Sequence, residues 1–166
     1  TEPWRMAVAY LWHYYGNEIP FPAGFKERVG EAKIQMLLKM MEKGINTPYT
    51  SGAGRLFDAI ASLLGVCDIS THQAEAPVKL EQLASDEHQR RYFVLIEGES
   101  ISMRPVFEGI LEDLAVGIPA TELSARFHNT LAWLLVEMAK RFRKQTGADK
   151  VVISGGCFQN RRLTEQ

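Results

Sequence analysis

The stretch Val151-Val152-Ile153-Ser154-Gly155-Gly156-Cys157-Phe158-Gln159-Asn160 is an apolar run that ends in two adjacent glycines. Its β-branched residues predict a strand over residues 151–154. Glycines directly after a strand let backbone N–H groups approach a phosphate or a ribose, and a helix that starts just beyond would point its positive end at that anion. The stretch therefore predicts a nucleotide-binding turn, although a glycine turn that serves only tight packing is the favoured interpretation of these residues alone.

Helical spacing dominates the rest of the chain. Apolar residues on nearly every face predict a mostly buried helix over residues 4–15. Apolar residues at helical spacing predict further helices over residues 34–41, 55–64, 78–84, 105–114 and 121–147. Residues 92–96 are β-branched and aromatic and predict a second strand, whereas residues 46–54 and 71–77 have the composition of loops. A helix, a strand, a glycine turn and a helix at the C-terminal end are typical of α/β sheets, so we expect an α/β fold with an excess of helix.

Composition excludes several classes of protein. The 166 residues carry a net charge of −1 and 46% of them are apolar, which is typical of a globular chain and gives no support to broad nucleic-acid binding. No apolar stretch approaches the roughly 20 residues of a membrane-spanning helix, and no secretory signal is readable. Cys67 and Cys157 lack CxxC spacing, which favours a reducing compartment. We therefore expect a cytoplasmic protein without nucleic-acid or membrane partners.

Both ends of the chain have helix-like sequence. It opens without a methionine and closes with Arg161-Arg162-Leu163-Thr164-Glu165-Gln166. We expect it to be a piece of a longer protein, truncated at both ends, so that part of any site lies outside it.

One predicted helix carries a polar face. At about 100° per residue, Arg55, Asp58 and Ser62 lie opposite the apolar residues of the helix over 55–64. We therefore expect Asp58 to face a cleft or solvent. Helix geometry alone favours an ordinary surface aspartate.

Four motifs, in one order along the chain, resemble the C-terminal carbamoyltransferase domain of the HypF family. They are residues 2–7 (EPWRMA), 51–65 (SGAGRLFDAIASLLG), 125–132 (ARFHNTLA) and 154–161 (SGGCFQNR). Co-linear motifs over nearly the whole chain make the resemblance specific. It implies that residues 1–166 form a partial domain: most of the second lobe of a TsaD-like fold, related to the actin and sugar-kinase ATPases.

The resemblance also implies a function in hydrogenase maturation. Such an enzyme builds a carbamoyl adenylate from carbamoyl phosphate and ATP, and passes the carbamoyl group to the C-terminal cysteine of the partner protein HypE. That thiol ends as a thiocyanate, the source of the cyanide ligands of NiFe hydrogenases. The resemblance further implies a divalent metal whose ligands lie outside this chain, and an isolated chain that is inactive.

Nucleotide-binding roles follow from the same motifs. Asp58 matches an aspartate placed to accept hydrogen bonds from ribose hydroxyls, which suits a carboxylate in a wet cleft. Gly155 and Gly156 match paired glycines near the phosphates and the adenosine. Asn160 matches an asparagine that reaches the nucleotide or the acyl adenylate. No residue is assigned a catalytic role.

The loop over residues 73–77 departs from the family pattern. Ala74 stands where the family usually has a glycine, so the approach of the backbone to a ligand is in doubt. Glu75 keeps a carboxylate that would accept a ribose hydroxyl, and an exposed loop acid is nearly as favoured.

The histidines and Cys157 are interpreted as structural residues and not as metal ligands or nucleophiles. By spacing, the four histidines do not form a metal set; they are His13, His72, His88 and His128. We expect His128, on the longest helix, to be packed or hydrogen-bonded. Cys157 is interpreted as a buried apolar residue and not as an acyl-accepting nucleophile.

Two alternative functions stay open. The same fold would serve a threonylcarbamoyl- or small-molecule carbamoyltransferase. A helical interaction module without a nucleotide site belongs to a different class. Absence of a cleft beside Gly155 and Asp58, or their separation onto opposite faces, would favour the module.

Overall fold

The computed structural model describes residues 1–86 and 89–165, and these form a helix-rich α/β arrangement. His88, one of the four histidines considered above, lies outside the described residues. The elements are α1 (Pro3–Tyr15), α2 (Phe25–Val29), α3 (Glu31–Glu42), α4 (Ala53–Leu63), α5 (Glu75–Leu83), β1 (Leu95–Glu97), β2 (Ser100–Ser102), α6 (Arg104–Ala115), α7 (Ala120–Thr146), the 3-10 helix η1 (Gly156–Gln159) and α8 (Arg161–Thr164).

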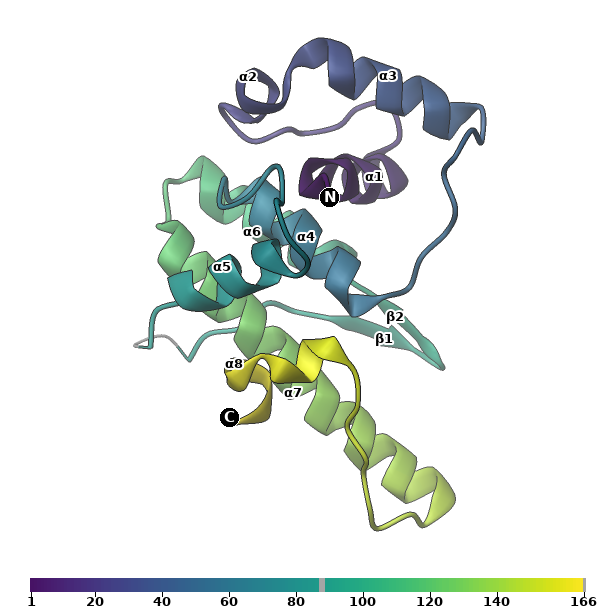
Figure 1. Cartoon of the computed structure of the whole chain (residues 1–166). Coiled ribbons are helices and arrows are strands. Elements are labelled where there is room, and N and C mark those ends of the chain that lie inside the picture. The colour runs from purple at the N-terminus through teal and green to yellow at the C-terminus, as the bar shows by residue number, and fades with distance from the viewer. Residues whose placement is uncertain (87–88, 166) are drawn as a thin grey trace.

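Helix α4 lies at the centre of the molecule (Figure 1). Every residue from Leu56 to Leu63 is buried, because α1 packs along one side of α4 and α5 along another. The polar residues Asp58 and Ser62 are buried with the apolar ones. Helix α4 therefore has no solvent face over this stretch, and tertiary packing overrides its amphipathic pattern.

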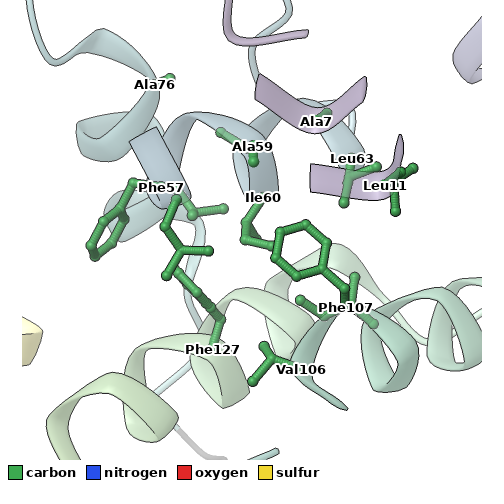
Figure 2. Close-up of a cluster of buried hydrophobic side chains, with 14 of the residues drawn as sticks. Ala7, Leu11, Phe57, Ala59, Ile60, Leu63, Ala76, Val106, Phe107 and Phe127 are labelled. Atoms are coloured by element: carbon green, nitrogen blue, oxygen red, sulfur yellow. The ribbon is translucent and has the colours of Figure 1, made fainter. Parts of the chain in front are cut away.

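The core joins α4 to α1, α6 and α7, as Figure 2 shows for ten labelled side chains. The Phe57 and Phe127 rings meet edge to face with centroids 5.2 Å apart, which is a favourable arrangement of two aromatic quadrupoles. Ile60 and Phe107 are fully buried in the same cluster. Aromatic residues from three helices thus fix the position of α4.

The predicted helices are present, with one boundary corrected. The loop predicted over residues 71–77 is wrong at its end, since α5 begins at Glu75. Pro77 lies in the first turn of α5, where a missing N–H breaks no helical hydrogen bond. Pro77 therefore marks the start of a helix and not the end of a loop.

The strand over residues 92–96 is shorter than predicted. Strands β1 and β2 form an antiparallel hairpin in which Leu95 pairs with Ser102, and Gly98 takes a φ of +59° in the turn. Before the hairpin, the backbone N–H of Tyr92 donates to Thr130 Oγ1 at 2.9 Å instead of to a strand. Tyr92 is thereby tied to helix α7 and not to the sheet.

The strand predicted over residues 151–154 is wrong for this structure. A strand needs a hydrogen-bonded neighbour, and the hairpin is the only sheet within residues 1–86 and 89–165. Val151, Val152 and Ile153 are 68, 91 and 55% exposed. The segment returns from the far end of α7, which extends beyond the other helices (Figure 1).

Within the described part of the chain, none of the helices combines the length and the apolar character that a bilayer-spanning segment requires.

Candidate functional site

The glycine turn and the loop before α4 line one cavity of about 630 Å³. Ser51, Gly52 and Ala53 form one wall at the N-terminus of α4, and residues 154–158 form another. Tyr10, Tyr14, Met103 and Leu131 are among the side chains that complete the lining. The cleft expected beside Gly155 and Asp58 is therefore present at Gly155, but Asp58 does not line it.

The backbone at Gly155 requires a glycine. Its φ of +101° lies in a region that side chains with a Cβ rarely adopt, and Gly156 then starts the 3-10 helix η1. A Cβ built on either glycine meets no atom within 4 Å. The space beside both glycines is thus open, and both line the cavity, so a ligand has room to approach the backbone.

Asp58 is buried, so the expectation that it faces a cleft or solvent is wrong. It is 3% exposed and does not line the cavity. Arg55 Nη1 lies 2.8 Å from Asp58 Oδ2 and forms an ion pair with it, although the N–H groups are not aligned for a hydrogen bond. Burial raises the pKa of the Asp58 carboxyl above its usual value, and the Arg55 charge opposes this rise.

Asn160 is also buried, and its amide contacts a histidine of α7. Asn160 Nδ2 lies 3.0 Å from His128 Nε2, while Asn160 Oδ1 has no hydrogen-bond partner among the described residues. His128 Nδ1 lies 2.8 Å from the carbonyl oxygen of Ser124. Ser124 Oγ donates to the Leu80 carbonyl at 2.5 Å. The expectation that His128 is packed and hydrogen-bonded is confirmed.

Burial is the main cause of the shifted pKa of His128. Burial lowers the pKa, the hydrogen bond to the Ser124 carbonyl raises it, and the charge of Arg162 lowers it; together they bring the pKa to about 4. His128 is therefore neutral at pH 7.

Glu75 is not an exposed loop acid. It is 7% exposed and accepts hydrogen bonds from the Thr71 backbone N–H at 2.5 Å and the Thr71 hydroxyl at 3.0 Å. Lys79 Nζ lies 2.6 Å from its other carboxylate oxygen. The hydrogen bonds from Lys79 and Thr71 lower the pKa of Glu75 to about 2. Its carboxylate holds the start of α5 and does not line the cavity.

Ala74, just before Glu75, has a left-handed backbone with φ +61° and ψ +14°. That conformation suits the glycine usual at this position in the family pattern.

Cys157 and the remaining histidines complete the set of sequence-predicted residues. Cys157 is half-buried and lines the cavity, so its interpretation as a buried apolar residue is only partly right. Within residues 1–86 and 89–165, no three His, Cys, Asp or Glu side chains lie close enough to hold a metal ion. His13 and His72 are exposed.

The structure brings only some of the predicted residues together. Gly155 and Gly156 share the cavity with residues 51–53, while Asp58, Glu75 and Asn160 lie outside its lining. The contact of Asn160 with His128 was missed by sequence reasoning, since 32 residues separate the two. The only signal was the spacing of Ser124 and His128, which places them on one face of α7.

The model of the family described as "Carbamoyltransferase, Kae1-like Domain, second subdomain" matches residues 1–166. The chain belongs to the HypF carbamoyltransferase family. It is 34% identical to carbamoyltransferase HypF of Rhodobacter capsulatus over 98% of this chain, and 30% identical to carbamoyltransferase HypF of Synechocystis over 95% of it. These matches span 21% and 22% of the two HypF relatives, so the chain covers about a fifth of their length.

A solved HypF structure has the same fold. The crystal structure of full-length HypF in the phosphate- and nucleotide-bound form aligns with a TM-score of 0.85 and 35% identity, over 99% of this chain and 26% of that one. The helix-rich α/β expectation is therefore confirmed for this chain.

Proposed function

We propose that this chain supplies part of the nucleotide and carbamoyl-adenylate site of an ATP-dependent HypF carbamoyltransferase. The enzyme takes carbamoyl phosphate and ATP and transfers the carbamoyl group to the C-terminal cysteine of HypE in hydrogenase maturation. A divalent metal takes part, with its ligands outside these residues.

Two buried acceptors carry the proposal. Asn160 Oδ1 has no hydrogen-bond partner in the described part of the chain, and Asp58 Oδ2 has an ion pair with Arg55 in place of a well-formed hydrogen bond. A buried acceptor without a donor costs about 1–3 kcal/mol and points to a group that the described residues do not supply. Both residues match the family's nucleotide-binding positions. Ribose hydroxyls and an adenine amino group are donors, so the two oxygens fit a nucleotide.

The cavity is a suitable site for the phosphate groups of ATP. Helix α4 begins at Ala53 beside the cavity, and the first N–H groups of a helix favour an anion. The glycine turn, which lines the same cavity, offers further backbone N–H groups. ATP, when bound, activates the carbamoyl group as an adenylate. The residues of this chain then contribute positioning and charge stabilisation while an external thiolate attacks.

Asp58 needs a local change to meet ribose hydroxyls. Arg55 is 43% exposed in its side chain and holds the carboxylate by an ion pair alone. Such a partly solvated pair contributes little stability, so a ligand with two hydroxyl donors competes with it readily.

Calorimetric titration of the full-length protein with ATP tests the site. We expect Asp58→Ala and Asn160→Ala each to weaken binding about tenfold, the loss of one good hydrogen bond. Asp149→Ala and Asn17→Ala remove the same groups at exposed positions and should leave the affinity unchanged. Unchanged affinity in the Asp58 and Asn160 variants would refute the residue assignment.

Mass spectrometry tests the reaction. A peptide with the HypE C-terminal sequence, incubated with the full-length protein, carbamoyl phosphate and ATP, should gain the mass of one carbamoyl group on its cysteine. No mass gain, with an intact enzyme that binds ATP, would favour a different acceptor.

A further inference from the structure

The Asn160 side chain forms a hydrogen bond with His128, and the other contact of the His128 ring determines which residue is the donor. Asn160 Nδ2 and His128 Nε2 are 3.0 Å apart, and both side chains are buried. The other ring nitrogen, Nδ1, lies 2.8 Å from the Ser124 carbonyl oxygen. A carbonyl oxygen only accepts, so Nδ1 must carry a proton.

The tautomer of His128 fixes the orientation of the Asn160 amide. A neutral imidazole with a proton on Nδ1 has a lone pair on Nε2, and that lone pair accepts a hydrogen bond. Asn160 must therefore turn its NH₂ group toward His128. The amide oxygen Oδ1 is left on the other side, buried and without a donor among the described residues.

Packing keeps both partners in place. The His128 ring contacts the Phe57 and Phe127 rings at centroid distances of 5.5 and 5.8 Å. Just after Asn160, the Arg161 backbone N–H donates to Glu81 Oε1 at 2.8 Å, and this bond ties the turn to helix α5. The His128 ring and the backbone next to Asn160 are thus fixed. The hydrogen bond to His128 then prevents rotation of the Asn160 amide group.

We propose that His128 is a positioning residue, which holds the Asn160 amide so that Oδ1 is the atom available to accept from a hydrogen-bond donor of the nucleotide. Asn160 lies just outside the cavity lining and Oδ1 is buried, so a local movement of the turn must open the cavity to it. This inference rests on the proposed nucleotide site and adds the residue that orients one of its contacts. Without the histidine acceptor, the amide is free to present NH₂ in place of oxygen, and the donor on the ligand then meets another donor.

A matched pair of substitutions in the full-length protein tests the role in binding. Glutamine and methionine have the same length, but only glutamine brings an amide oxygen to replace the Nε2 acceptor. We expect His128→Met to weaken ATP binding about tenfold and His128→Gln to retain most of the affinity. Circular dichroism melts verify that both variants are folded at the titration temperature. Equal affinities of the Gln and Met variants would overturn the proposal.

A double-mutant cycle separates positioning from a general effect on the fold. If His128 acts through Asn160, then His128→Met combined with Asn160→Ala binds ATP no more weakly than Asn160→Ala alone. Additive losses would overturn the proposal, since His128 would then act by another route.

Nuclear magnetic resonance tests the orientation without any ligand. Long-range ¹H–¹⁵N spectra of the ¹⁵N-labelled chain at pH 7 should show a proton on His128 Nδ1 and none on Nε2. A proton on Nε2 would overturn the proposal. If the spectra agree but the wild-type protein binds no ATP, the proposed function fails and the amide orientation stands.

Discussion

At the scale of single residues, Ala74 has a left-handed backbone that glycine adopts at lower cost. Its φ is +61° at the residue before α5. A Cβ in this conformation costs about 1–2 kcal/mol, so we expect Ala74→Gly to raise the free energy of unfolding by about 1 kcal/mol in urea denaturation. Ala139→Gly, within α7, is the control and should lower it by about 1 kcal/mol. A loss in both variants would contradict the prediction.

His128 makes the stability of the chain depend on pH. Burial lowers its pKa to about 4 from an ordinary 6.5, so the unfolded chain binds the proton more tightly. The stability it contributes is complete above pH 6.5 and is lost as the pH falls from 6.5 to 4, by about 3 kcal/mol in total. We expect His128→Gln to remove this part of the pH dependence in denaturation measured from pH 7 to pH 4.

The control for the pH dependence is His13→Gln, at an exposed position. It should leave the slope of unfolding free energy against pH as in the wild type. A slope that is equally steep in the His128→Gln variant would show that other groups cause it.

At the scale of elements, Gly109 allows α6 to lie against the segment before the hairpin. A Cβ at Gly109 would lie 2.7 Å from Tyr92 Cδ1. Tyr92 has little room to move, because it is buried and its hydroxyl donates to Asp113 at 2.8 Å. We expect Gly109→Ala to lower the free energy of unfolding by about 1–3 kcal/mol, against the usual gain for alanine in a helix.

Gly54→Ala in α4 is the matched control for Gly109→Ala. A Cβ at Gly54 meets no atom within 4 Å, so helix propensity alone acts there. Thermal denaturation should show a stability gain of up to about 1 kcal/mol. Gains in both variants would contradict the close packing of Tyr92 on α6.

The sequence was sufficient for elements whose signal is local. Spacing by three and four predicted the long helix α7, because one side of that helix is buried and the other is not. The burial of Asp58 was not predictable in the same way, since it depends on α1 packing along α4. Residues 151–154 have strand-forming side chains but no described neighbour to pair with. Local sequence propensity thus predicted the helices well, but it did not predict which segments pair as strands.

The candidate site was predictable in its residue types and not in its contacts. Gly155 was recognisable from the chain alone, because a glycine pair after an apolar run marks a turn. The hydrogen bond from Asn160 Nδ2 to His128 Nε2 joins residues that are 32 positions apart in the chain. No rule based on local spacing predicts such a contact.

At the scale of the whole molecule, this chain is expected to contact a bound nucleotide from one side only. The cavity beside Gly155 is partly open to solvent, and the neighbouring Val151, Val152 and Ile153 are exposed. A nucleotide held from one side keeps only part of its contacts and stays open to water, whereas transfer of the carbamoyl group needs a closed site that excludes water. The 166-residue chain alone is therefore expected to bind ATP weakly and to transfer no carbamoyl group.

The measurement is a mass spectrum of the HypE tail peptide after incubation with carbamoyl phosphate, ATP and either the isolated chain or the full-length protein. The full-length protein should add one carbamoyl group, and the isolated chain at the same concentration should add none. Its melting curve, recorded in the same buffer, verifies that the isolated chain is folded, so that inactivity reflects an incomplete site. Carbamoyl transfer by the isolated chain would mean that Gly155, Gly156 and the N-terminus of α4 form a complete catalytic site without residues from the rest of the protein.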